Sequence, residues 1–166
     1  MQIAAPHLFS ISHTIRVLRS HDPSFVPAPR TPVRRSDNAD GFYDVQQPDI
    51  QPKWNNRGRF VTGADGTYNF VGIKPVSYPI PDDGPVGQML GMLGRHPYRP
   101  GHMHYIVTAP GFQKVVTHTF VEGDQYLVSD CVFGVKRTLV AKYQRDEAGE
   151  DGVQWKSGFD FIMTPQ

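Results

Sequence analysis

The sequence is poor in several features, and each shortage narrows the class of protein. One cysteine among 166 residues excludes an internal disulfide framework and favours a reducing compartment such as the cytoplasm. Lys and Arg number 17 against 16 Asp and Glu, so no basic field favours nucleic acid or an anionic membrane as partner. No apolar run reaches the length of a bilayer span. We therefore expect a cytoplasmic protein that binds neither nucleic acid nor membrane.

Glycine, proline and aromatic residues are abundant instead. There are 16 glycines and 15 prolines, and aromatic residues make up 11% of the chain, which favours a compact all-β domain. Residues 1–36 differ from the rest, because prolines interrupt any regular element and arginines make the segment basic. The prolines are Pro23, Pro27, Pro29 and Pro32. We expect a Pro/Arg-rich lead-in over 1–36, in which 11–18 could be a short helix or a strand, and one domain over 37–166.

Turn signals and alternating polarity predict several strands after residue 37. Asp65–Gly66 tolerates the positive φ of a tight turn, so 57–62 and 67–71 are expected to pair as an antiparallel hairpin. Residues 146–152 predict an acidic turn. Further strands are predicted over 102–108, 114–121, 138–143 and 155–163.

A single helix is expected among these strands. Residues 84–93 carry apolar side chains at helical spacing, and the face of Met89, Leu90 and Leu93 is expected to pack on the sheet. The predicted fold class is therefore all-β: a β-sandwich of mainly antiparallel strands with one short helix, incomplete at its N-terminal end.

Two histidines provide the first candidate for chemistry. His102 and His104 precede the β-branched residues Ile106 and Val107, so they are expected on a strand. Side chains alternate between faces along a strand, so both imidazoles project from one face. Two ring nitrogens at about 2 Å from a common centre would supply half of a metal site. A pair of surface histidines is the alternative, and other ligands must come from elsewhere in the chain.

Four separated motifs place this histidine pair in a wider pattern. They are NADGFYDVQ at 38–46, KPVSYPIP at 74–81 followed by DGP at 83–85, GRH at 94–96, and RPGHMH at 99–104. In order and spacing the pattern resembles the intradiol ring-cleaving dioxygenases, in particular the catechol and hydroxyquinol 1,2-dioxygenases. The resemblance implies a mononuclear non-haem ferric ion, Fe(3+), held by two tyrosinates and two histidines. Carried over by motif, these ligands are Tyr43, Tyr78, His102 and His104.

The residue types suit the implied metal. Ferric iron is a hard ion that anionic phenolate oxygens stabilise, whereas an Fe(II) site more often offers two histidines and a carboxylate. Either tyrosine alone is more commonly a core or rim aromatic. Together with the histidine pair, the two tyrosines favour the ferric site over a cupin-like metal enzyme that uses the histidines alone.

The resemblance also implies an activity and roles for further residues. The expected partners are a small aromatic diol, either hydroxyquinol or catechol, and O2, and the expected product is a muconate- or maleylacetate-type dicarboxylic acid. Tyr78 is expected to leave the metal and accept a substrate proton. Arg99 is expected beside the ring, where its permanent charge stabilises anionic density, although an ion pair with a loop aspartate is the alternative role. His118 is expected near the oxygen site, where many catechol enzymes have glutamine, and this favours a hydroxyquinol-like enzyme.

The chain departs from the family pattern at two places. Gly101 stands where the family usually has alanine, which is expected to add backbone freedom beside a ligand. Residues 1–36 do not resemble the family's N-terminal helical domain, which contributes dimer contacts and part of the substrate pocket, so a homodimer is expected only with that domain. Missing strands would expose a sheet edge or a core face. The alternative function is therefore a truncated, catalytically inactive β-sandwich fragment or interaction module.

Overall fold

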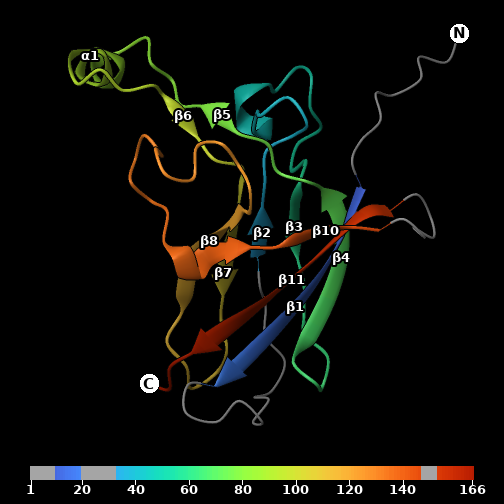
Figure 1. Ribbon diagram of the computed structural model, residues 1–166. Helices are drawn as coiled ribbons and strands as arrows, with labels where there is room; N and C mark the ends of the chain where they lie inside the picture. The colour runs from blue at the N-terminus through green and yellow to red at the C-terminus, as the bar shows by residue number, and fades with distance from the viewer. Residues whose placement is uncertain (1–9, 20–32, 147–152) are drawn as a thin grey trace, which may run out of the picture.

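The computed structural model describes residues 10–19, 33–146 and 153–166, which form two facing β-sheets (Figure 1). The four-stranded sheet has the order β10-β11-β1-β4, and the five-stranded sheet has the order β3-β2-β7-β8-β9. The strands of the first sheet are β1 (Ser10–Arg19), β4 (Thr67–Ile73), β10 (Tyr143–Arg145) and β11 (Val153–Met163). Those of the second are β2 (Val33–Arg35), β3 (Arg57–Arg59), β7 (His102–Val107), β8 (Val115–Val121) and β9 (Val140–Ala141).

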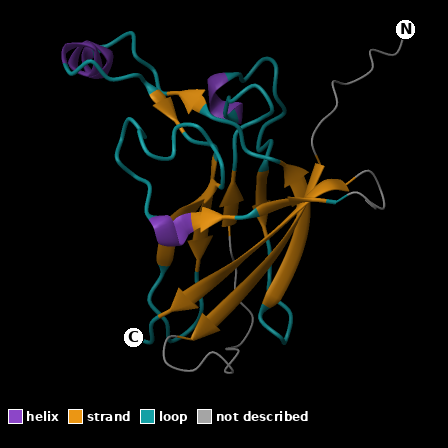
Figure 2. Ribbon diagram, viewed as in Figure 1, coloured by secondary structure: helices purple, strands orange, loops and turns teal. Residues whose placement is uncertain are grey.

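Few other elements accompany the sandwich. A two-stranded ribbon consists of β5 (Tyr78–Pro79) and β6 (Tyr98–Arg99), and single 3-10 turns form η1 (Asp44–Gln46) and η2 (Arg137–Leu139). Over the described ranges the only α-helix is α1 (Pro85–Met92), and Figure 2 draws the 3-10 turns in the same purple as this helix. No helix in this part of the chain is long and apolar enough to cross a membrane. The predicted all-β sandwich with one short helix is confirmed.

The core lies between the two sheets and follows from alternation along the strands. Met103, Tyr105 and Val107 of β7 are fully or almost fully buried, so their side chains face the other sheet. They pack with Tyr68, Phe70, Phe161 and Met163 from the opposite sheet. Each such side chain stabilises the fold by about 1.5–3 kcal/mol through burial. Because these residues fill the inner face of β7, its histidines are left on the outer face.

Strand β1 occupies an interior position in the four-stranded sheet. It pairs antiparallel with β4 and parallel with β11, so residues 11–18 form a strand rather than a helix. Strand β2 lies between β3 and β7 in the other sheet. Two strands from residues 1–36 therefore pair with the rest of the chain, and the predicted division at residue 36 stays a prediction. The proline-rich stretch 20–32 lies outside the described residues.

The hairpin predicted around Asp65–Gly66 is wrong, although the turn itself is present. Gly66 has a φ of 75°, and the Gly63 N–H donates to the Thr67 carbonyl oxygen at 2.8 Å. The flanking strands do not pair, because β3 belongs to one sheet and β4 to the other. Instead of pairing with each other, β3 pairs with β2 and β4 pairs with β1. The turn therefore carries the chain from one layer to the other.

The strand predicted over 138–143 is also divided between the layers. The 3-10 turn η2 ends at Leu139, and the short strands β9 and β10 follow in different sheets. Strands β7, β8 and β11 occur where the sequence predicts them. The predicted acidic turn lies outside the described residues, except for Asp146.

The prediction that α1 packs on the sheet is wrong. Leu90 is buried, but Met89 is 51% exposed and Leu93 is 63% exposed. In Figure 1, α1 stands away from both sheets, beyond the β5–β6 ribbon. Helical spacing of apolar residues shows that a helix has an apolar stripe, but it does not show what covers that stripe.

Candidate metal centre

The two histidines lie side by side on the outer face of β7. His102 is fully buried and His104 is partly buried, and their ring centroids are 5.0 Å apart. The neighbouring strand β8 places Phe120 opposite His102 and His118 opposite His104. The predicted common face of the pair is therefore confirmed.

Each of the two tyrosines comes from a tightly held segment. Tyr43 precedes η1, and its N–H donates to the Gln46 side chain at 2.8 Å. The turn before it is closed by Asn38, whose side-chain oxygen accepts the N–H of Phe42 at 2.9 Å. Tyr78 begins β5 and pairs with Arg99 of β6, so the ribbon holds it against the end of the five-stranded sheet. Both side chains are thus positioned by their own backbone hydrogen bonding.

The donor atoms of these side chains converge. The Tyr43 and Tyr78 hydroxyl oxygens are 3.3 Å apart, and the Tyr78 oxygen is 3.2 Å from His102 Nε2. The ring of His104 lies 6.4 Å from that of Tyr43, between centroids. The structure therefore brings together all four residues that the motifs singled out, across more than 60 positions of sequence. Their role as metal ligands stays a prediction.

His102 presents a lone pair to this cluster. Its Nδ1 atom lies 2.7 Å from the Pro100 carbonyl oxygen, which can only accept, so Nδ1 carries the proton and the lone pair is on Nε2, with the Tyr78 hydroxyl and Arg99 Nη1 each 3.2 Å away. Burial, and to a lesser degree the charge of Arg99, lower the pKa of His102 to about 3, although the Pro100 hydrogen bond opposes this. The imidazole is therefore neutral, as a metal ligand must be.

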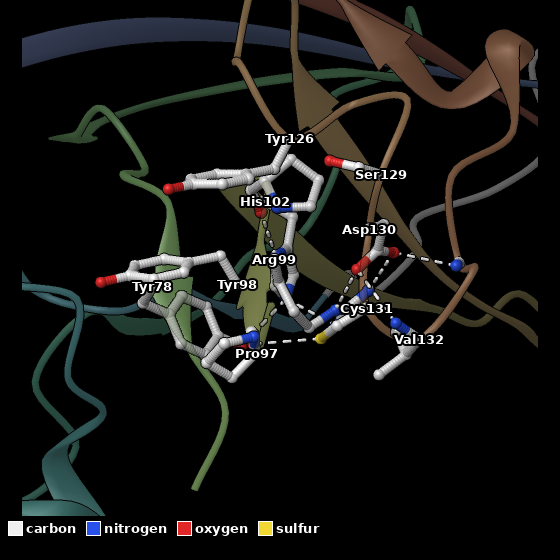
Figure 3. A network of polar contacts seen from close by, with 12 residues as sticks. Tyr78, Pro97, Tyr98, Arg99, His102, Tyr126, Ser129, Asp130, Cys131 and Val132 are labelled. Atoms are coloured by element: carbon white, nitrogen blue, oxygen red, sulfur yellow. Dashed lines mark hydrogen bonds and ion pairs between the residues drawn. The ribbon is translucent and has the colours of Figure 1, made fainter. Parts of the chain in front are cut away.

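Arg99 joins the cluster to a buried aspartate (Figure 3). Its Nη1 atom is 3.2 Å from His102 Nε2, while Nε and Nη2 donate to the two Asp130 oxygens at 3.1 and 3.2 Å. Asp130 also accepts the Gly134 N–H at 2.8 Å. Burial alone raises the pKa of Asp130, but the hydrogen bonds from Arg99 and Gly134 outweigh it and hold the pKa below the usual range.

Asp130 was not among the residues singled out from the sequence. A buried arginine requires a carboxylate partner, but 16 acidic residues leave the choice open. The ion pair that was considered as an alternative role for Arg99 is present. It does not displace Arg99 from the cluster, because one guanidinium nitrogen still reaches His102.

His118 lies at the edge of the same cluster. Its ring centroid is 5.5 Å from that of His104 and 5.8 Å from that of His102. The Nε2 atom is buried and has no hydrogen-bond partner in the part of the chain that the structure describes. Burial and the nearby Arg99 charge lower the pKa of His118, although a backbone hydrogen bond with Gly134 and the charge of Asp130 oppose this. The side chain is therefore a neutral polar group at the edge of the cluster.

The donor set suits a hard, highly charged cation. Burial raises the pKa of Tyr78, so its phenolate form would need a nearby positive charge. Ligands at about 2 Å from one ion lie roughly 3 Å apart, which matches the separations around Tyr78. Among the described residues, no group of three His, Cys, Asp or Glu side chains is arranged to hold a metal. A metal ion bound at this cluster would therefore draw on the phenol oxygens as well as the imidazoles.

A cleft opens beside His104 on the outer face of the five-stranded sheet. Its volume is about 880 Å³, which lies within the usual range for a small-molecule pocket. Apolar walls come from Trp54, Ile106 and Val116. Trp54 was not singled out from the sequence, since its position depends on a positive φ of 71° in an irregular loop.

The family model described as "Dioxygenase" matches residues 34–165 of this chain. Together with the relatives it resembles, this match shows that the chain belongs to the intradiol ring-cleaving dioxygenase family. The family predicted from the four motifs is therefore confirmed.

The similar curated proteins include hydroxyquinol and chlorohydroxyquinol 1,2-dioxygenases. The chain is 54% identical over 135 residues to a hydroxyquinol 1,2-dioxygenase of Rhizobium sp. (strain MTP-10005), covering 76% of this chain and 46% of the relative. It is 44% identical over 128 residues to a 6-chlorohydroxyquinol 1,2-dioxygenase of Cupriavidus pinatubonensis, covering 77% and 45%. The chain spans about half the length of the curated relatives it matches.

Solved structures extend the match further towards the N-terminus. The crystal structure of hydroxyquinol 1,2-dioxygenase from Pseudomonas putida DLL-E4 aligns with a TM-score of 0.85 and 38% identity, covering 95% of this chain and 57% of that one. A 3-chlorocatechol 1,2-dioxygenase from Rhodococcus opacus 1CP aligns with a TM-score of 0.85 and 25% identity, covering 95% and 60%. Because residues 34–166 alone could not supply 95% of the chain, part of the segment before residue 34 has a structural counterpart.

Proposed function

We propose that this chain carries the ferric centre of an intradiol dioxygenase and cleaves hydroxyquinol or catechol with O2 to a muconate- or maleylacetate-type dicarboxylic acid. The observation that supports this most strongly is the convergence of Tyr43, Tyr78 and His102 donor atoms, with separations of 3.2–3.3 Å beside His104. The four side chains reach this point from three separate segments of the chain. Core aromatic packing gives no reason for two hydroxyls and two imidazoles to meet.

Tyr43, Tyr78, His102 and His104 would hold the ferric ion. Two phenolates offset much of the charge of a hard trivalent ion, and the two imidazoles complete the donor set. The proton on His102 Nδ1 already points to the Pro100 carbonyl, so the ring is oriented with its lone pair towards the centre. The chemistry expected from a bound ferric ion is chelation of both diol oxygens and withdrawal of electron density from the ring.

Three side chains around the centre suit the handling of charge and protons. Tyr78 occupies a buried position in which a phenolate oxygen is a strong base, so it can take the proton of a diol hydroxyl. Arg99 keeps a permanent positive charge beside His102, where it stabilises anionic density on a bound ring. His118 would add a buried polar nitrogen next to His104, at the edge of the cluster.

Hydroxyquinol is the substrate that the comparisons favour over catechol. The relative with 54% identity is a hydroxyquinol 1,2-dioxygenase, and so is the solved structure with 38% identity. A third hydroxyl group on the substrate ring needs a polar partner, and His118 is a polar group positioned next to His104.

Ferric reconstitution tests the metal site directly. The purified chain, loaded with Fe(III), should develop a tyrosinate-to-iron absorption band in the visible region, and hydroxyquinol or catechol should shift that band. Tyr43→Phe and Tyr78→Phe should each alter the band, whereas Tyr98→Phe should leave it unchanged. Tyr98 is the matched control because it lies on the same ribbon and stacks on Tyr126 instead. A colourless reconstituted protein would reject the tyrosine roles.

An interaction module without catalysis is the second candidate function. The exposed apolar side chains of α1, namely Met89, Met92 and Leu93, favour it, because large exposed apolar patches commonly mark binding surfaces. Oxygen consumption on addition of hydroxyquinol separates the two candidates. An iron-loaded protein that consumes O2 with the diol supports the enzyme, and one that binds iron without consuming O2 supports the module.

A further inference from the structure

Of the four motifs, GRH at 94–96 contributes no residue to the candidate metal centre. It directly follows α1, and the Arg95 N–H donates to the Leu90 carbonyl oxygen of that helix at 2.9 Å. Its side chains contact residues 129–130 of the loop between β8 and η2. The motif therefore joins the helix to the loop that supplies Asp130.

Arg95 binds this loop at both ends of a turn. Its Nη2 atom donates to the carbonyl oxygens of Ser129 and Asp130 at 3.2 and 2.9 Å. Its guanidinium carbon lies 4.1 Å from the centre of the Phe133 ring. A guanidinium group is planar, so it can donate to carbonyl oxygens while it stacks on an aromatic ring. The turn from Asp130 to Phe133 is thus fastened by one side chain.

The backbone of this turn has a conformation that needs such support. The Phe133 N–H donates to the Asp130 carbonyl oxygen at 3.0 Å, and Phe133 has a φ of 56°. A bulky residue adopts this left-handed conformation only where the surrounding structure enforces it. Phe133 is 76% exposed, so little of its side chain is held by the core. The stack on Arg95 is therefore a contact that keeps the turn in this shape.

Two further contacts link the same segments. His96 Nε2 lies 2.9 Å from Ser129 Oγ, and the Cys131 N–H donates to the Tyr98 carbonyl oxygen at 3.2 Å. The Tyr98 N–H donates to His96 Nδ1, so the ring proton is on Nε2 and the histidine does not activate Ser129 as a nucleophile. These contacts hold residues 129 and 131, whereas Arg95 also reaches the far end of the turn.

The shape of the turn sets the direction of the Asp130 carboxylate (Figure 3). One carboxylate oxygen accepts the Val132 N–H at 3.4 Å and the other accepts the Gly134 N–H at 2.8 Å. The same two oxygens accept Arg99 Nε and Nη2, which leaves Nη1 at 3.2 Å from His102 Nε2. A displacement of the turn is therefore passed on to Arg99.

We infer that Arg95 is a positioning residue, which holds the 130–134 turn and, through the Asp130 carboxylate, orients the Arg99 guanidinium group towards the candidate metal centre. This inference rests on the proposed function, because Arg99 can stabilise anionic density only when a diol is bound there. Arg95 binds the loop and not the four proposed ligands. Its effect should fall on kcat, since the anionic density grows in the transition state.

Hydrogen exchange in the metal-free protein tests the positioning step. The Arg99 Nε–H, followed by NMR and assigned by its loss in Arg99→Lys, should exchange at least about tenfold faster in Arg95→Met than in wild type, because the carboxylate that covers it is displaced. The Tyr105 amide of the buried strand β7 reports global opening and should not change in parallel. The matched control is Arg145→Met, an exposed arginine of β10 in the other sheet, which should leave both rates unchanged.

Ferric reconstitution tests the consequence for turnover. Iron-loaded Arg95→Met should keep the tyrosinate band, because none of the proposed ligands is altered. Its kcat with hydroxyquinol should fall by about 10- to 100-fold with little change in KM, since a displacement of about 1 Å at a reacting centre has an effect of this size. Arg95→Lys keeps the charge and the hydrogen-bond donors but not the planar stack on Phe133. It should lie between wild type and Arg95→Met in both the exchange rate and kcat.

The outcomes separate this inference from the proposed function. Equal Arg99 exchange rates in wild type and Arg95→Met would overturn the inference, and so would an increase that the Tyr105 amide shares. Faster exchange at Arg99 alone, together with a wild-type protein that shows no ferric band, would support the positioning step but reject the proposed function. If Arg95→Met does not fold, Arg95→Lys carries the test, and an Arg99 exchange rate equal to that of wild type would then refute the role of Arg95.

Discussion

Replacing Asp130 with alanine removes the carboxylate that binds the buried guanidinium group of Arg99. The side chains of Arg99 and Asp130 are 11% and 2% exposed, so the remaining charge cannot be solvated in place. The same substitution removes the acceptor for the Gly134 N–H. The variant is therefore expected to lose stability through an uncompensated buried charge, more than through the loss of a favourable pair.

The expected loss is about 3–5 kcal/mol, which is the usual cost of breaking a buried ion pair by removing one partner. A domain of this size has a total stability of roughly 5–15 kcal/mol, so the variant should be marginal. With a urea dependence of about 2 kcal/mol per molar, the unfolding midpoint should fall by roughly 2 M. Adding Arg99→Met should recover part of the loss, because no charge then remains buried.

Urea unfolding followed by tryptophan fluorescence provides the measurement. The control is Asp83→Ala, which removes a carboxylate from an exposed position. Surface substitutions usually change stability by no more than about 0.5 kcal/mol, so this midpoint should move by less than about 0.5 M. An Asp130→Ala midpoint no lower than that of the control would refute the reasoning.

The remaining predictions concern pH and packing. The pKa of His102 is lowered to about 3 in the folded chain, so below about pH 6.5 the unfolded chain binds a proton at this histidine that the folded chain does not. Metal-free protein should therefore lose stability as the pH falls from about 6.5 towards 3. Urea titrations at several pH values should show this loss, and His102→Gln should make it smaller. Leu90→Ala should cost about 2–5 kcal/mol in thermal or urea unfolding, because Leu90 is buried. Met92→Ala should stay within about 0.5 kcal/mol of wild type, because Met92 is 83% exposed; equal losses in the two variants would contradict the observed orientation of α1.

Local sequence patterns predicted the elements that carry the site, because the relevant physics is local. Alternation in 102–107 requires His102 and His104 to share one face of a strand, and β7 shows them there. The Asp65–Gly66 pair likewise predicted a turn that is present. The motifs around Tyr43 and Tyr78 indicated the family, which the comparisons confirm.

Pairing partners and coverage could not be predicted in the same way. The strands on either side of Asp65–Gly66 lie in different sheets, because β1 and β2 arrive from far earlier in the chain and occupy the pairing edges. The apolar stripe of α1 is largely exposed for a similar reason, since what covers a stripe depends on distant segments. The residues of a turn or a helix do not indicate which distant segments will pack against it.

The sequence by itself determined which side chains the proposed metal site would use: two phenols and two imidazoles, with an arginine beside them, in motifs of recognisable spacing. Only the tertiary structure decided that the Tyr78 hydroxyl lies within 3.3 Å of the Tyr43 hydroxyl and His102 Nε2, and that Asp130 is the carboxylate that binds Arg99. The physical reason is that residue types fix which chemical groups are present, and local spacing fixes which side chains share a face of a strand. Which groups come into contact depends instead on the packing of segments that lie far apart in the chain.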